Sequence, residues 1–162
     1  MTTTSTTEPD RTEDRKALVL APVMSSGGCP PDMEAPSGGS VESGGIYPTA
    51  DGVFCYTIGE PAADGNDLND ATLSDVEGEF QVYTRVKEES VDKLNELFNS
   101  CFSGAPTCPP GEGGNGYVAI ILEGTVLYAP AIQAEDIAAD GFSVAGGLTE
   151  RRAREIITLI NR

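Results

Sequence analysis

The chain has 162 residues and carries 26 acidic against 10 basic side chains, a formal net charge of −16. Such a charge repels the phosphates of nucleic acids and of anionic lipids, so it opposes binding to both, and it excludes nucleic acid as the main partner. Histidine is absent, so histidine-dependent triads, imidazole bases and zinc sites with histidine ligands are excluded as well. We expect one globular domain with no cofactor and no metal. Catalysis by carboxylates stays open, although no pair of acidic residues stands out by its spacing.

The first third of the chain is predicted to hold a tail, two strands and a long loop. Residues 1–15 are rich in threonine and lack aliphatic side chains after the first residue, so we expect a flexible tail or linker before a domain over residues 16–162. Tails of this composition tether exported domains, and we expect membrane contact only through an anchor that has been removed. Lys16–Val23 and Gly52–Ile58 are predicted strands, and Met24–Asp51 between them is a loop rich in Gly, Ser and Pro.

The middle third is predicted to contain a short helix, a strand and a long helix. Asp64–Ala71 is similar in composition to a calcium loop but lacks the oxygen ligands that an EF-hand requires, so we predict a helix capped by Asn66 or Asp67. Glu79–Val86 alternates apolar and polar residues with the period of a half-buried strand. Glu88–Phe102 has apolar residues at helical spacing and acidic residues in its first turns.

The last third is predicted to consist of the strands Tyr117–Leu122, Thr125–Ile132 and Phe142–Ala145, a helical turn at Ala134–Ala139 and the helix Glu150–Asn161. Glu-Gly between the first two strands suits a tight hairpin turn, since glycine supplies the positive φ. The final helix begins after a threonine, a good N-cap, and its three arginines are expected to pair with nearby carboxylates. The whole order predicts an α+β fold, with a mixed or antiparallel sheet and two longer helices packed on one face.

The four cysteines, Cys29, Cys55, Cys101 and Cys108, indicate disulfides rather than a metal site. A zinc site of four thiolates uses two closely spaced pairs, and only Cys101 and Cys108 are near each other in sequence. Of the three possible connectivities we predict Cys101 with Cys108, separated by glycine and proline that let the chain reverse, and Cys29 with Cys55. Disulfides form in oxidising compartments, so we expect an extracytoplasmic protein, secreted or in the cell envelope.

The region from Gly116 to the end resembles the head of the first extracytoplasmic domain of SecD, an accessory subunit of the protein translocase. That head has three apolar residues and an acidic-Gly turn, then an Ala-Pro step, and later a strand flanked by glycines before a threonine that opens a helix. The matching residues here are Ala119, Ile120, Ile121, Leu122, Gly124, Val126, Ala129, Pro130, Ile132, Gly141, Val144, Gly146, Thr149 and Ala153. The chain departs from the pattern at Tyr128, at Gly147-Leu148 and at Arg151. The resemblance extends more loosely back to about residue 16.

The resemblance implies a non-catalytic extracytoplasmic binding domain, because the SecD head holds emerging unfolded polypeptide and the proton-conducting residues of that family lie in membrane helices. We expect a protein or peptide partner connected with the envelope or with translocation, and an exported, membrane-tethered lipoprotein of actinobacterial type. Alternatively, the domain is a structural or interaction module of a bacterial or phage-encoded lipoprotein that docks one envelope partner. An enzyme that uses carboxylates is the third possibility.

For a peptide-binding site we predict the strand end Tyr128, Ala129 and Pro130 together with Gly146 and Gly147. Proline interrupts ladder pairing and paired glycines leave the backbone open, and an exposed aromatic beside them suits the addition of a peptide strand. The simpler alternative is that Pro130 only ends a strand and the two glycines only turn the chain into the final helix.

Overall fold

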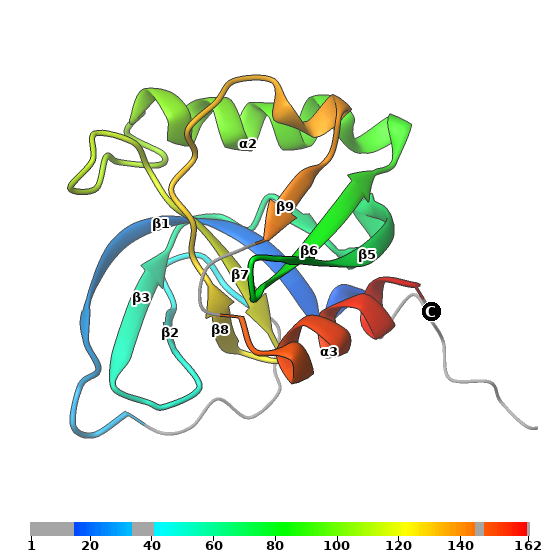
Figure 1. Ribbon diagram of the computed structural model, residues 1–162. Coiled ribbons are helices and arrows are strands. Elements are labelled where there is room, and N and C mark those ends of the chain that lie inside the picture. Colours follow the sequence, from blue (N-terminus) through cyan, green and yellow to red (C-terminus); the bar gives the residue numbers. More distant parts are fainter. Residues whose placement is uncertain (1–14, 34–40, 145–147, 162) are drawn as a thin grey trace, which may run out of the picture.

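The computed structural model describes residues 15–33, 41–144 and 148–161 (Figure 1). The α+β class predicted from the sequence is confirmed, and the strands divide into two antiparallel sheets. In chain order the elements are β1 (Leu18–Gly28), β2 (Ile46–Pro48), β3 (Phe54–Ile58), β4 (Ala63–Asp64), the 3-10 turn η1 (Gly65–Asp67), β5 (Leu68–Val76), β6 (Glu79–Val86), η2 (Glu88–Ser90), α2 (Val91–Ser103), β7 (Val118–Leu122), β8 (Thr125–Tyr128), η3 (Ile137–Ala139), β9 (Phe142–Val144) and α3 (Glu150–Asn161).

The larger sheet has the strand order β2-β3-β1-β7-β8, and β4 pairs with β1 beside this path. β1 belongs to both halves of the sheet, because a bulge between Val23 and Ser25 changes its register. Residues before the bulge pair with β7, and residues after it pair with β3. A parallel bridge between Thr49 and Val126 joins the chain just after β2 to β8, so the sheet curls and brings its two edges together.

The centre of the larger sheet, where residues 18–22 of β1 pair with β7, is buried on both faces, which explains why this part of β1 and all of β7 are apolar. Successive side chains of these two strands enter two different hydrophobic clusters. The main cluster also contains the apolar faces of both helices and of the smaller sheet. The second cluster is closed by Ile58 of β3 and by Tyr47 and Tyr56. Both helices therefore pack on the same side of the larger sheet, as predicted.

β5, β6 and β9 form the smaller sheet, which lies between α2 and α3 in Figure 1. β5 and β6 are joined by a two-residue turn, Glu77-Gly78, in which both residues have positive φ (54° and 85°). The hairpin predicted between β7 and β8 turns in the same way at Glu123-Gly124, with φ values of 51° and 81°.

The final helix has the predicted bounds and cap. Thr149 accepts a hydrogen bond at Oγ1 from the backbone N–H of Arg152 (3.2 Å), which satisfies one of the free donors of the first turn. The arginines pair with carboxylates, as expected: Arg151 and Arg152 with Glu155, and Arg154 with Glu150. Three residues at helical spacing form its buried face, namely Ala153, Ile156 and Ile160.

The short helix predicted from Asp64 onward is wrong. Asp64 itself caps a single 3-10 turn, and the chain then enters β5. Beyond a bulge at the start of β5, Ala71 and Leu73 both pack in the main cluster with a spacing of two, which is the period of a strand. The predicted loop Met24–Asp51 is also shorter than expected, because β1 continues to Gly28 and the chain forms β2.

Asp67 holds the turn after β4 against the start of α2. Its carboxylate accepts hydrogen bonds from the backbone N–H of Asp64 (3.0 Å) and from Ser90 Oγ (2.7 Å), and lies 2.7 Å from Lys93 Nζ. Burial raises the pKa of Asp67, but these hydrogen bonds outweigh it and hold the pKa below its ordinary value.

Both predicted disulfides are present, Cys29–Cys55 between the end of β1 and β3, and Cys101–Cys108 between the end of α2 and the loop before β7. Gly116 packs directly on the second disulfide. A Cβ at this position would lie 2.7 Å from Cys108 Sγ, so a side chain does not fit there. The backbone N–H of Gly116 donates to the carbonyl of Cys101 (2.6 Å), which fixes the start of β7.

Candidate functional site

The predicted site residues lie at the end of β8 and after β9. Tyr128 is the last residue of β8, and Ala129 and Pro130 follow it. Gly146 and Gly147 lie outside the described residues, directly after β9 in sequence. The structure therefore places three of the five predicted residues, all on one segment.

The expectation that Pro130 interrupts the ladder is wrong for the side that faces β7. The Pro130 carbonyl accepts a hydrogen bond from the backbone N–H of Val118 (3.1 Å), and the N–H of Ile132 donates to the Gly116 carbonyl (3.0 Å). Tyr117 and Ala131 form a bridge between these two bonds. Since proline keeps its carbonyl and loses only its donor, pairing along β7 continues past it.

Tyr128 is half-buried rather than fully exposed. Its side chain packs against the main cluster, whereas that of Ala129 packs against the second cluster on the opposite face. Burial raises the pKa of Tyr128, and the negative charge of Glu79 adds to this shift. The ring is thus partly a core residue and presents only one edge to solvent.

An apolar cleft of about 280 Å³ opens between the segment 130–134 and β9. Leu20 and Ile120 of the larger sheet and Phe98 of α2 lie deep in it, and each is almost fully buried. Pro130 on one wall and Phe142 on the other complete the opening. None of the described residues that line the cleft is charged.

β9 presents a free edge toward this cleft, as the register of the smaller sheet shows. In a two-residue hairpin the residues flanking the turn form a hydrogen-bonded pair, and hydrogen-bonded and non-hydrogen-bonded pairs alternate from there. Counting from the turn, Val82 and Thr84 direct their backbone groups out of the hairpin, toward β9. Tyr83 and its partner Ser143 are the non-hydrogen-bonded pair between them. Ser143 therefore points its own N–H and C=O away from β6, and no described strand pairs with β9 on that side.

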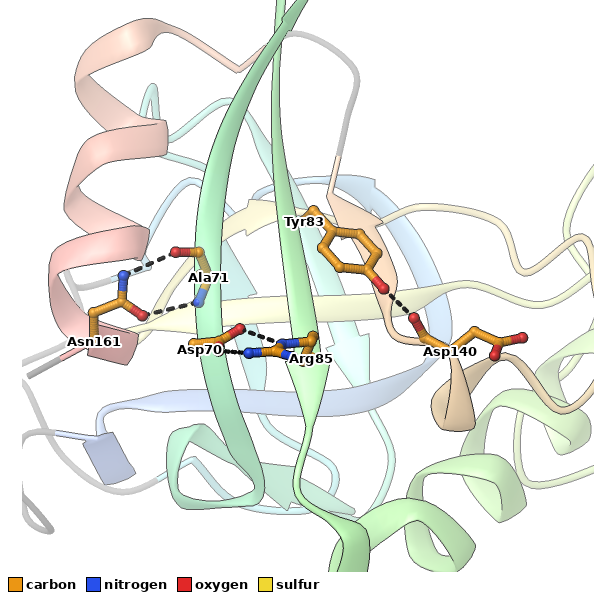
Figure 2. A network of polar contacts seen from close by, with 6 residues as sticks. All are labelled: Asp70, Ala71, Tyr83, Arg85, Asp140 and Asn161. Atoms are coloured by element: carbon orange, nitrogen blue, oxygen red, sulfur yellow. Dashed lines mark hydrogen bonds and ion pairs between the residues drawn. The ribbon is translucent and has the colours of Figure 1, made fainter.

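The opposite edge of the smaller sheet is blocked by a side chain (Figure 2). Asn161, the last residue of α3, accepts a hydrogen bond at Oδ1 from the N–H of Ala71 and donates from Nδ2 to the carbonyl of Ala71, both at 2.8 Å. The amide thus occupies the outward backbone groups of β5 as a neighbouring strand would. The outer edge of the smaller sheet is thus covered at Ala71, whereas no described strand pairs with β9 on its outer side.

Several contacts hold the open edge in place before any partner binds. The Tyr83 hydroxyl donates to the carbonyl of Asp140, at the start of the turn into β9 (Figure 2). Gly141 follows with φ of +85°, and a Cβ there would lie 2.6 Å from the Thr84 carbonyl oxygen. On the other side, η3 is fixed to α2, because Asn95 Oδ1 accepts from the N–H of Ala138 (2.9 Å).

This arrangement is suited to strand addition. An extended peptide beside β9 can exchange backbone hydrogen bonds with Ser143 and place one side chain in the cleft. Within the described part of the chain, no cluster of three or more His, Cys, Asp or Glu residues has a geometry that could hold a metal ion.

The sequence prediction included neither Ser143 nor Asn161. The alternation Phe-Ser-Val predicts a strand at β9, yet which edge of a strand is free depends on pairing with residues about 60 positions away. For Asn161 the sequence offers only a weak signal, because an asparagine at the end of an amphipathic helix is also common at ordinary helix ends.

Comparison with solved structures finds similar chains, two of which are structures of SecDF. The structure is similar to SecDF, as the resemblance in sequence predicted. One match is a structure of SecDF described as a membrane component that enhances protein export, with 25% identity and a TM-score of 0.50 over 64% of this chain and 41% of the other. A second is SecDF in a super-membrane-facing form, with 19% identity and a TM-score of 0.58 over 93% of this chain and 20% of the other.

The chain spans less than half the length of either SecDF chain. The likeness therefore concerns one part of SecDF, and the SecD head-like fold agrees with it. No family model matches the chain, and no curated protein matches it.

Proposed function

We propose that this protein is a non-catalytic extracytoplasmic domain that binds extended polypeptide by strand addition at β9. The observation that carries the proposal is the open edge at Ser143 beside a cleft that reaches the main core. Backbone hydrogen bonds would supply affinity for any extended segment, and the cleft would select the side chain that enters it.

The wall opposite β9 completes the proposed site. The strand end Tyr128–Pro130 is tied to β7 by backbone hydrogen bonds and does not need to move when a peptide binds. Gly146 and Gly147 belong to the proposed site because their lack of side chains would leave the backbone after β9 accessible. A preformed site of this kind loses little conformational entropy on binding.

The proposed extracytoplasmic location rests on the disulfides of the chain. Two disulfides are present, and disulfides persist mainly in oxidising compartments. SecDF enhances protein export. The similarity of the fold to SecDF supports a role for this domain near exported or envelope polypeptides. The proposal includes a membrane anchor that tethers the protein. None of the described helices is long and apolar enough to span a membrane.

The test is a substitution that removes the outward donor of β9 and nothing else in the sheet. Ser143→Pro deletes an N–H that faces away from β6, so the β6–β9 ladder keeps its bonds. An uncharged nine-residue peptide in which threonine alternates with valine or leucine serves as the probe, followed by fluorescence anisotropy. We expect Ser143→Pro to weaken binding about tenfold, the value of roughly one backbone hydrogen bond, and the control Ser143→Ala to bind normally.

Two further measurements guard against an unfolded variant. Circular dichroism should show the wild-type spectrum for both substitutions. In the wild-type protein, peptide binding should slow hydrogen exchange at the Ser143 amide. Unchanged exchange at Ser143, with Tyr128→Ala and Gly147→Val also binding as wild type, would refute the site.

A second candidate function is an interaction module that docks one envelope protein, and an exposed apolar surface favours it. Val53 and Phe54, where the chain enters β3, are adjacent exposed apolar residues, and Val53 is 69% exposed. If this surface is the functional one, Val53→Asp would abolish capture of the envelope partner while peptide binding at β9 persists.

A further inference from the structure

We propose that the peptide recognised at the β9 cleft carries an apolar residue at its anchor position and lysine or arginine at its flanks. This inference rests on the proposed strand addition and adds the chemistry of the ligand. It depends on two independent features, the interior of the cleft and the charges around its mouth.

The interior of the cleft requires an apolar anchor. The side chains at its bottom, among them Leu20, Val118 and Phe98, are at most 2% exposed. A charged side chain placed among them would lose its hydration without gaining a partner, which costs several kcal/mol. Neighbouring residues of an extended peptide point to opposite sides, so only alternate positions of the ligand face this interior.

The mouth of the cleft is acidic. Glu135, Asp136 and Asp140 lie in the connection between the two walls, and all three are exposed. In the described part of the chain none of them forms a salt bridge, whereas the arginines of α3, Arg85 and Lys93 are paired with other carboxylates. Glu79 is a further carboxylate, close enough to Tyr128 at the end of β8 for its charge to act on the phenol. A cationic flank would therefore meet several carboxylates that have no cation of their own among these residues.

The same charges disfavour a second copy of this chain as the occupant. An open edge can pair with its equivalent in another molecule, but two copies would each bring a net charge of −16. Like charges placed opposite each other across an interface cost several kcal/mol. A basic peptide is therefore the ligand whose charge complements this edge.

The experiment compares two charged versions of one probe. The peptides KTVTLTVTK and ETVTLTVTE share an apolar alternation and differ only in the charge of their ends. At low ionic strength we expect the lysine peptide to bind at least about tenfold more tightly, and the difference to shrink as salt rises toward 0.5 M, where exposed charges are screened within about 4–5 Å. Replacing the central leucine by aspartate should abolish binding of the lysine peptide.

Variants of the protein locate the charge effect. Glu135→Gln with Asp140→Asn should weaken the lysine peptide about three- to tenfold, since each exposed pair is worth about 0.2–1 kcal/mol. Asp32→Asn with Glu112→Gln changes the net charge equally but lies outside the connection between the two walls, and should change affinity less than about twofold.

Each outcome decides a different claim. Equal affinity of the two charged peptides, with the uncharged probe still sensitive to Ser143→Pro, would overturn the basic preference and leave strand addition standing. An equal effect of the two double variants would show that only the overall charge attracts the peptide, which also overturns the inference. Failure of every peptide to bind would overturn strand addition and the inference together.

Discussion

Asn161 should contribute more to stability than its exposed place at the end of α3 suggests. Asn161→Ala removes two hydrogen bonds to Ala71 and leaves the N–H and C=O of a residue that is only 2% exposed without partners. Each bond contributes about 1 kcal/mol, and the higher helix propensity of alanine returns about 0.5 kcal/mol. We therefore expect a loss of about 1.5 kcal/mol in the free energy of unfolding, or roughly 3–6 °C in Tm for a chain of this size.

Urea denaturation followed by circular dichroism measures this loss, and hydrogen exchange locates it. In the variant the Ala71 amide should exchange faster, while amides of β7 in the larger sheet keep their protection. Thr158→Ala, an exposed position on the same helix, is the matched control and should leave the free energy of unfolding within about 0.5 kcal/mol of wild type. A loss below about 0.5 kcal/mol for Asn161→Ala would show that the amide does not act as a substitute strand.

Two further predictions concern covalent and ionic links. On the chain-entropy model, replacing Cys29 and Cys55 by alanine should lower the free energy of unfolding by about 3.5 kcal/mol, and replacing Cys101 and Cys108 should lower it by about 2.5 kcal/mol, as measured by urea denaturation. Under limiting reductant the Cys29–Cys55 disulfide should be reduced first, because Cys29 is partly exposed and both Cys101 and Cys108 are fully buried. Mass spectrometry after alkylation would show the order of reduction. Asp67 has a folded-state pKa below its unfolded value. Its contribution to the free energy of unfolding is therefore present above about pH 4 and is lost as the pH falls through the folded-state pKa. The difference in this free energy between wild type and Asp67→Asn should disappear in acid, and a difference that stays constant down to about pH 2 would refute the role of this carboxylate.

Elements that depend on local pattern were predictable from the sequence. The stripe of Ala153, Ile156 and Ile160 and the cap at Thr149 define α3 with the bounds seen in the structure. The disulfide pairing also followed, because the spacing of Cys101 and Cys108 leaves little choice. In these cases residues close together in the sequence are sufficient to predict the observed structure.

β5 shows where this reasoning fails. Leu68, Ala71 and Leu73 suit one face of a helix nearly as well as one face of a strand, because short apolar patterns fit both periods. The decision comes from outside the segment, since the Glu77-Gly78 turn pairs it with β6 and the amide of Asn161 satisfies its outer edge. Long-range hydrogen bonds of this kind leave little trace in the local sequence.

One of the reasons for predicting a binding site at Pro130 was wrong. Pro130 was expected to leave backbone groups unpaired, yet its carbonyl is bonded to Val118 and the free groups belong to Ser143 on the facing strand. The sequence could not assign the open edge, because both edges of β9 look alike until β6 occupies one of them. The predicted approach of the strand end to Gly146 and Gly147 stays a prediction, because both glycines lie outside the described residues.

The contrast between the two edges of the smaller sheet argues that the open one is functional. An unpaired strand edge invites aggregation, and proteins usually cover or charge it. In this chain the side chain of Asn161 covers Ala71 on the β5 edge, whereas no described strand covers β9, which lies next to an apolar cleft. With a net charge of −16, copies of the chain would repel each other at this edge. A domain that only needed to be stable would gain from sealing both edges, so the asymmetry is what a site kept ready for an added strand requires.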